Sequence, residues 1–228
     1  MKRLVVMGEG EGEERAAPWL VRKVLQGLNV HDVHVVDNAM RVGELPKLIK
    51  DDYANWKRFL KAAKTAHRAD AVLLLIDGDC PANSLHREFC ARSEAIRLTE
   101  VARSIGAGTT FSAGIVFACM EFESWCLWAA ESLRGRSFPD GRAVLKAKTE
   151  ALPPDPENGY RDAKGWLNRN LATGYSPTRD QEQLVRLIDW SVVAEKKPRS
   201  FVRLQSALSR LADAVRAGVH ISDPVSKK

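Results

Sequence analysis

The feature that most constrains the fold is an apolar run at residues 71–76, Ala-Val-Leu-Leu-Leu-Ile, which ends abruptly at Asp77-Gly78-Asp79. A short run without polar alternation, bounded by turn residues, is typical of a strand that is buried on both faces. Other short apolar runs predict further strands at residues 4–7, 33–36 and 115–120. Strands of this kind occur in parallel sheets that helices cover on both sides.

Segments with helical periodicity alternate with these strands. The spacing of their apolar residues predicts helices at residues 14–28, 53–68, 83–104 and 121–133. Asn83 or Ser84 is suited to cap the third of these helices. Strands that alternate with helices of about a dozen residues form βαβ units with parallel pairing. The sequence therefore predicts the α/β class, with a mostly parallel sheet flanked by helices.

The pattern changes after residue 134, where prolines interrupt the periodicity. The ordered features expected there are short helical pieces at 163–172 and 181–190 and an amphipathic helix at 201–217, followed by a frayed tail from Gly218. We therefore expect an α/β catalytic core at residues 1–134 and a basic, mainly helical extension at residues 135–228 that packs on it.

Charge is distributed unevenly along this chain, whose formal net charge is +6. From residue 134 onward there are 18 Lys and Arg against 11 Asp and Glu, whereas the earlier part has 17 against 18. An acidic-centred part joined to a basic part fits a nucleic acid ligand, with metal ions between carboxylates and phosphates. An excess of this size is also common in proteins that bind no nucleic acid.

The sequence carries no pattern for export or membrane insertion. No apolar run approaches the ~18 residues of a membrane span, and the run after Met1-Lys2-Arg3 is too short for a signal peptide. The four cysteines form no CxxC pair and do not cluster with histidines, a pattern that favours neither a zinc site nor a disulfide framework. We expect a cytoplasmic protein with reduced thiols, and the sequence leaves its oligomeric state open.

Acidic residues follow three of the predicted strands at the point where each strand ends. They are Glu9 after the first strand, Asp77 and Asp79 after the run at 71–76, and Glu121 and Glu123 after the last strand. The loops that leave the carboxyl ends of parallel strands face one crevice, so these carboxylates should converge and attract a cation. Mg²⁺ and Mn²⁺ take such oxygen ligands and assist phosphodiester cleavage.

Each acidic motif also has a simpler structural interpretation. The first could be a solvated acidic turn, the aspartates could close a turn through bonds to the backbone, and the last two glutamates could belong to the first turn of a helix. Other ligand motifs fit less well. The stretch from Gly8 to Gly12 lacks the third glycine of a dinucleotide fingerprint, and no GxxxxGK[ST] phosphate loop occurs.

Glu9-Gly10-x-x-Glu13 after a first strand, followed by Asp77-x-Asp79 after a later one, resembles the Toprim fold of topoisomerases, primases and OLD nucleases. More narrowly, the chain resembles a bacterial family of unknown function with a Toprim-like fold, from Glu9 to about Leu211. The motifs that carry this resemblance are EGEGE at 9–13, DGDCP at 77–81, EFESW at 121–125, RDAKGWL at 161–167 and YSPT at 175–178.

The resemblance implies roles for individual residues. The metal ligands would be Glu9, Glu13, Asp77, Asp79 and one or both of Glu121 and Glu123. The catalytic residues would be Glu9, as a general acid or base, Asp77 and Lys164. Lys164 is the candidate for a cation that contacts the phosphate, although a lysine on a helix surface is the alternative. Met120 departs from the family pattern, in which a basic residue is expected.

These observations predict a Mg²⁺- or Mn²⁺-dependent nuclease that acts on DNA or RNA. Members of the family that it resembles often occur beside ATPases in defence loci, which implies an antiviral effector controlled by an ATPase partner. A chain of 228 residues leaves no room for the extra domains of a topoisomerase or primase. The alternative function is a non-catalytic adaptor that keeps the fold and binds a protein partner.

Overall fold

The computed structural model describes residues 2–80, 85, 88–158 and 160–225. In chain order the elements are β1 (Lys2–Gly8), α1 (Glu13–Gly27), β2 (Val33–Val35), β3 (Met40–Arg41), α2 (Leu45–Thr65), β4 (Ala71–Asp77), α3 (Ala91–Ser104), β5 (Ser112–Ala118), α4 (Glu123–Trp128), the 3-10 helix η1 (Ala130–Leu133), α5 (Ala163–Asn170), the π-helical turn η2 (Pro177–Gln181), α6 (Glu182–Leu187), α7 (Trp190–Lys196), α8 (Arg199–Ala217) and β6 (Ser222–Asp223). From β1 to α4 the helices and strands alternate, except that β2 and β3 follow one another directly.

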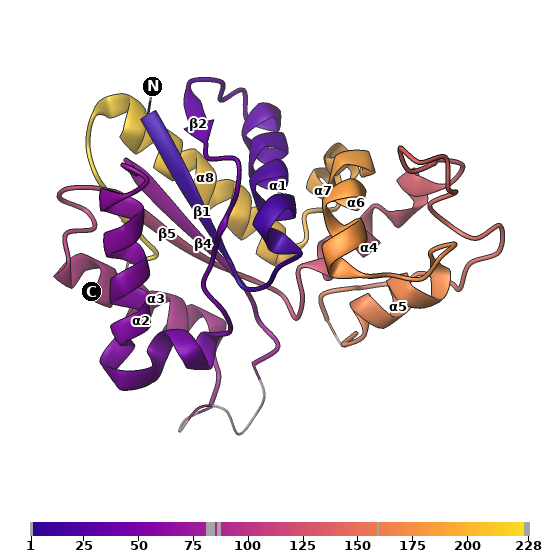
Figure 1. Ribbon diagram of the computed structural model, residues 1–228, viewed down its shortest axis with the longest axis horizontal. Helices are drawn as coiled ribbons and strands as arrows, with labels where there is room; N and C mark the ends of the chain where they lie inside the picture. The colour runs from indigo at the N-terminus through magenta and orange to yellow at the C-terminus, as the bar shows by residue number, and fades with distance from the viewer. Residues whose placement is uncertain (1, 81–84, 86–87, 159, 226–228) are drawn as a thin grey trace.

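One parallel sheet of six strands forms the centre of the molecule (Figure 1). Its order is β2-β1-β4-β5-β6, and β3 pairs with the carboxyl end of β1. Strand β4 lies between β1 and β5, with Met7 opposite Leu74 and Asp77 opposite Ala118. The predicted α/β class with a mostly parallel sheet is therefore confirmed.

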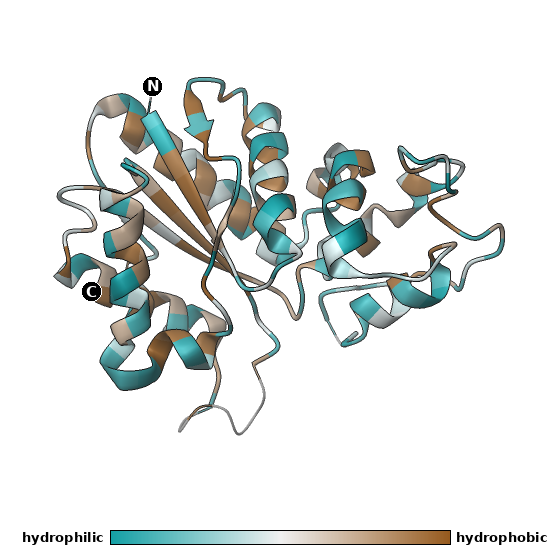
Figure 2. Cartoon of the chain, in the orientation of Figure 1, coloured by the Kyte–Doolittle hydropathy of each residue, from teal (hydrophilic) through white to brown (hydrophobic). Residues whose placement is uncertain are grey.

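Helices cover both faces of the sheet, because successive residues of its strands point to opposite sides. Leu4, Val6 and Leu73 belong to a core with α1 and α8, whereas Val5 and Val72 belong to a second core with α2 and α3. Figure 2 shows hydrophobic strands in the interior and hydrophilic residues on the outer sides of the helices. This double burial explains why the strand sequences read as continuous apolar runs.

The chain after β5 forms a smaller lobe and then returns to the sheet. Helices α4 to α7 group beside the sheet, whereas α8 packs along β5 (Figure 1). Strand β6 then adds to the edge of the sheet, with Ala113 opposite Ser222. The predicted frayed tail from Gly218 is wrong for the residues up to Val225, because buried Ser222 and Asp223 pair with β5.

Strand β5 begins at Ser112, three residues earlier than the apolar run predicts, and it includes Gly114. Gly114 precedes the predicted strand, and its place inside β5 has a packing reason. A Cβ atom at this position would lie 3.0 Å from Cδ1 of Leu211 on α8, so the glycine lets the helix approach the strand closely. The strand ends at Ala118, and Met120 takes a left-handed conformation (φ 62°) in the turn that follows.

Several predicted helix boundaries also differ from the structure. Helix α3 begins at Ala91 rather than residue 83, because Cys90 has an extended backbone, and the proposed caps at residues 83–84 lie outside the described residues. Helix α2 begins earlier than expected and is interrupted at residues 50–53, which have non-helical dihedral angles. The predicted helix at 121–133 is divided into α4 and η1.

The described helices contain no segment with both the length and the apolar character that a membrane-spanning helix requires.

Candidate functional site

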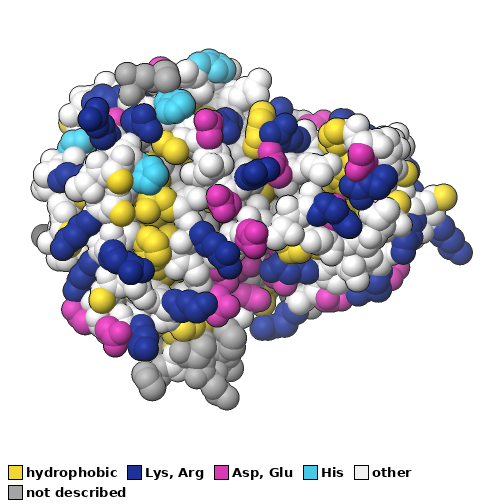
Figure 3. Space-filling view, viewed as in Figure 1, with side chains coloured by type: hydrophobic (Ala, Val, Ile, Leu, Met, Phe, Trp, Pro, Cys, Tyr) yellow, Lys and Arg dark blue, Asp and Glu magenta, His cyan; other side chains and the backbone are white. Residues whose placement is uncertain are grey.

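The acidic residues predicted at three strand ends lie at one end of the sheet, because β1, β4 and β5 are adjacent and parallel. Glu9 directly follows β1, Asp77 is the last residue of β4, and Glu121 follows the turn after β5. Figure 3 shows acidic side chains gathered between the sheet and the smaller lobe.

A cleft of about 290 Å³ opens at this point, and we call it the acidic cleft. Its lining residues are Glu9, Glu44, Leu45, Pro46, Asp77, Asp79, Cys80 and Lys164. Four of the residues predicted from the sequence therefore share one cleft: two from strand ends, one from the loop after β4, and Lys164 from α5. Glu44, which directly precedes α2, was not predicted from the sequence.

Asp77 connects the three strand ends through its backbone and side chain. Its backbone N–H donates to Oε2 of Glu9 (3.2 Å), and its Oδ1 accepts a hydrogen bond from the backbone N–H of Phe122 (2.8 Å). The neighbouring Gly78 allows this close approach of β4 and β5, because a Cβ atom there would lie 2.5 Å from the carbonyl oxygen of Ala118. The aspartate therefore joins neighbouring loops rather than closing a local turn.

Glu123 extends this set into the interior. Its side chain is fully buried, and its Oε1 accepts hydrogen bonds from the hydroxyl of Tyr175 (2.7 Å) and from Nε2 of Gln181 (3.3 Å). Gln181 also donates to Oε1 of Glu13 (3.4 Å), which is itself buried and accepts a bond from the backbone N–H of Gly10. Glu13 and Glu123 are the first residues of α1 and α4, so the assignment of Glu123 to the first turn of a helix is confirmed. Both are also buried and belong to one hydrogen-bond network, so Glu13 is not part of a solvated turn.

Lys164 places its ammonium group among three of the carboxylates. Its Nζ lies 3.4 Å from Oδ2 of Asp77, 3.7 Å from Oε1 of Glu121 and 3.6 Å from Oε2 of Glu123. The backbone N–H of Lys164 also donates to Oε2 of Glu121 (3.1 Å). The side chain of Lys164 is 41% exposed, so its ammonium group contacts the buried acids and is also accessible from the cleft.

Three carboxyl groups of this site have raised pKa values. Burial, together with smaller effects of the nearby Glu13 and Asp79, raises the pKa of Glu9 to about 7 despite the hydrogen bond from Asp77. Burial likewise raises the pKa of Glu123 to about 7, against the opposing effect of Lys164. The pKa of Asp77 is raised well above its ordinary value by burial and by Glu123. A second cation would therefore stabilise their charged forms.

The chemistry of these residues fits a hard divalent cation. All the candidate ligands are carboxylates, and Oε2 of Glu123 is buried without a hydrogen-bond donor among the described residues. Among the residues that the structure describes, no three acidic, histidine or cysteine side chains lie close enough to bind one metal ion. The ammonium group of Lys164 is the cation that these carboxylates contact in this arrangement.

The remaining acidic residues differ in exposure. Asp79 is exposed and lines the cleft, whereas Glu11 is 64% exposed and faces Arg41, with 3.9 Å between Oε2 and Nη1. Glu11 therefore faces solvent and Arg41, away from the buried network that holds Glu13. Tyr175 lies in the YSPT motif, which by itself indicates no function for it. No pattern in the sequence points to Gln181.

The family described as "Domain of unknown function (DUF4276)" matches residues 8–209 of the chain. No curated protein matches the chain. Among solved structures, the C-terminal region of the Burkholderia pseudomallei OLD protein is similar, with 16% sequence identity and a TM-score of 0.44. That alignment covers 94% of this chain and 99% of the other. A similarity at this level does not establish a shared activity.

Proposed function

The chain belongs to the DUF4276 family, and from its acidic cleft we propose that it is a divalent-metal-dependent nuclease that hydrolyses phosphodiester bonds of DNA or RNA. The observation that carries this proposal is the convergence of carboxylates from three adjacent strand ends. Glu9 accepts a hydrogen bond from the backbone of Asp77, and the carboxylate of Asp77 shares the ammonium group of Lys164 with Glu121 and Glu123. Purely structural ion pairs rarely require several desolvated acids at one end of a sheet, which is where α/β proteins bind ligands.

The carboxylates would hold Mg²⁺ or Mn²⁺. The proposed ligands are Glu9, Glu13, Asp77, Asp79, Glu121 and Glu123. Such an ion supplies a water of lowered pKa and neutralises charge on the phosphate. Tyr175 and Gln181 hold Glu123 in place through donated hydrogen bonds to Oε1. Its other oxygen, Oε2, accepts no hydrogen bond among the described residues and faces the ammonium group of Lys164 at 3.6 Å, so it is available to a cation.

Glu9 and Lys164 are the groups that we assign to substrate. Glu9 lines the cleft, and its pKa of about 7 suits a residue that exchanges protons with an attacking water near neutral pH. The acids around Lys164 keep it protonated, because their charges outweigh the effect of burial and raise its pKa above the ordinary value. Its exposed ammonium group would bind a phosphate oxygen in the cleft.

The wider setting is proposed on the resemblance of the motifs alone. It comprises a Toprim-like active site, a cytoplasmic location, an ATPase partner and a role in antiviral defence. A basic, mainly helical extension from residue 135 onward would contact nucleic acid.

One observation favours a different function. Because the ammonium group of Lys164 already neutralises part of the acidic cluster, the cluster could be a structural ion-pair network. The protein would then be a non-catalytic adaptor that binds a protein partner. A metal titration separates the two functions, because an adaptor of this kind needs no divalent ion.

The proposal is tested by incubating the purified protein with DNA, RNA and tRNA in Mg²⁺ or Mn²⁺, with and without a candidate ATPase. We expect cleavage that is lost in Asp77→Ala and Glu9→Gln and retained in Glu11→Gln, the matched control from the same motif. Mg²⁺ should also raise the melting temperature of the wild type. Cleavage that persists in Asp77→Ala, or a melting temperature that millimolar Mg²⁺ leaves unchanged, would contradict the metal site.

A further inference from the structure

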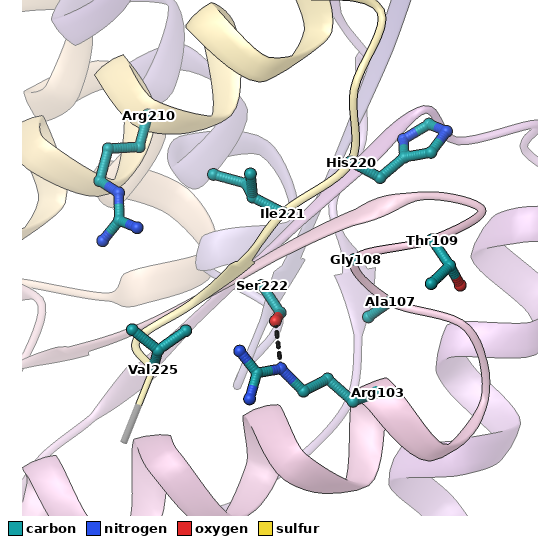
Figure 4. Close-up of a pocket in the computed structure, with 9 residues that line it drawn as sticks. All are labelled: Arg103, Ala107, Gly108, Thr109, Arg210, His220, Ile221, Ser222 and Val225. Carbon is teal, nitrogen blue, oxygen red and sulfur yellow. Dashed lines mark hydrogen bonds between the residues drawn. The ribbon is translucent and has the colours of Figure 1, made fainter. Parts of the chain in front are cut away.

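A second and larger cleft, of about 440 Å³, lies at the edge strand β6 (Figure 4), and we call it the basic cleft. It is lined by the end of α3, the loop before β5, the middle of α8 and the chain around β6. Ser222 pairs with Ala113 near the start of β5, whereas the acidic cleft lies beyond the other end of that strand. The two clefts share no lining residue.

The charge of this cleft is opposite to that of the acidic cleft. Its lining residues include Arg103, Arg210 and His220 but no aspartate or glutamate. Figure 4 shows that the two arginines approach the edge strand from different helices on its two sides, with Ser222 beside Arg103. An anion is therefore the ligand that its charge favours.

Arg103 is only partly engaged by the protein. Its Nε donates to Oγ of Ser222 (2.5 Å), and its two Nη groups make no hydrogen bond or ion pair within the described part of the chain. Guanidinium groups with free Nη donors bind phosphate oxygens in a bidentate manner. The hydrogen bond to Ser222 fixes the direction of the guanidinium group, which lowers the entropy cost of binding a ligand.

Arg210 adds a second positive charge. Its guanidinium group contacts the buried carboxylate of Asp223, which Arg203 also contacts at 2.5 Å. Two arginines thus share one carboxylate, and an excess positive charge remains at the cleft. The side chain of Arg210 is 49% exposed, so it is accessible to a ligand.

The rest of the lining can contact the other parts of a nucleotide. Nδ1 of His220 is buried and has no hydrogen-bond partner among the described residues, and Thr109 provides a hydroxyl group. Ile221 and Val225 supply apolar surface, and the side chain of Val225 is 42% exposed. A volume of about 440 Å³ lies in the range of small-molecule sites and exceeds what one phosphate fills.

We propose that the basic cleft binds a phosphate-bearing ligand of about mononucleotide size, with the phosphate on the free Nη groups of Arg103 and with Arg210 as the second cation of the cleft. The ligand is either a free nucleotide or one nucleotide unit of a nucleic acid strand, since both present the same phosphate and base. This site is independent of the proposed nuclease function, because it lies apart from the acidic cleft.

The test is isothermal titration calorimetry in EDTA with AMP and with a short 5′-phosphorylated oligonucleotide. We expect Arg103→Gln and Arg210→Gln each to weaken binding by about tenfold, because each removes a charge-assisted hydrogen bond to the phosphate. The matched control is Arg92→Gln, an exposed arginine at the other end of α3, which should leave the affinity unchanged. Inorganic phosphate should compete with the bound ligand.

Each result separates the possible ligands. Binding of AMP that the two variants weaken supports a free nucleotide, whereas binding of the oligonucleotide alone supports a nucleic acid strand. Binding of neither ligand, or binding that is equal in the double arginine variant, overturns the proposal. Asp77→Ala should bind the ligand as the wild type does, so loss of nuclease activity in that variant leaves this result interpretable.

Discussion

Replacing Lys164 by methionine tests the electrostatics of the acidic cleft. The change keeps most of the aliphatic side chain and removes the ammonium group, which lies 3.4 to 3.7 Å from three carboxylates. Two of these, Asp77 and Glu123, are at most 8% exposed, so water cannot replace the lost charge around them. We therefore expect the variant to fold but to be less stable near neutral pH.

The expected loss of folding stability depends on how deeply the lysine and the carboxylates are buried. Removing one partner of a fully buried ion pair costs about 3–5 kcal/mol. Because the side chain of Lys164 is 41% exposed and screened by solvent, we expect a smaller loss of about 2 kcal/mol. For a chain of this length that loss lowers the melting temperature by roughly 4–8 °C.

The measurement is differential scanning calorimetry of wild type and Lys164→Met at pH 8 in EDTA, with the exposed Lys148→Met as the control. Adding Mg²⁺ should raise the melting temperature of Lys164→Met more than that of the wild type, because a divalent ion replaces the missing charge. Equal melting temperatures for wild type and Lys164→Met in EDTA would refute the reasoning. A loss as large in Lys148→Met would refute it as well.

Three further predictions concern the same site. Folding raises the pKa values of Glu9 and Glu123 from 4.5 to about 7, so between pH 4.5 and 7 the folded state binds more protons at these two residues than the unfolded state does. Their contribution to the free energy of unfolding should therefore fall as pH rises from about 4.5 to 7. Urea unfolding in EDTA measures this pH dependence, which Glu123→Gln should reduce. Tyr175→Phe should lower the free energy of unfolding by about 1–3 kcal/mol, because a buried carboxylate loses a donor, and an unchanged urea midpoint would contradict this. Gly78→Ala should lower the free energy of unfolding by about 1–3 kcal/mol, because the new methyl group would clash with the carbonyl oxygen of Ala118. A melting temperature that rises in this variant would contradict the close packing of β4 against β5.

The sequence locates the acids at the strand ends because its signals there are local. A buried parallel strand must be apolar until it leaves the sheet, so the first acid after each run marks the strand end, as at Glu9 and Asp77. Parallel pairing puts these ends on one edge of the sheet, and they meet because β1, β4 and β5 are neighbours, an order that the tertiary structure sets. Glu13 and Lys164 came only from the resemblance of the motifs, since neither follows a strand directly.

Other parts of the site depend on contacts between distant segments. Gln181 reaches Glu13 and Glu123 because η2 packs beside α1, and glutamine at such a position has no distinguishing pattern in the chain. Glu44 enters the cleft through the start of α2, which the sequence places later. Packing between distant segments fixes these positions, and the spacing of residues within one segment does not reveal it.

The class of the fold, the doubly buried strands and the acidic residues at their ends follow from the amino-acid order alone, because burial imposes an apolar run on every strand that helices cover. The places of Gly114 in β5, of Ser222 and Asp223 in an edge strand, and of Lys164 among the acids come instead from the packing of the folded chain. Each of these depends on a partner far along the chain, and the basic cleft at β6 exists because of such pairing.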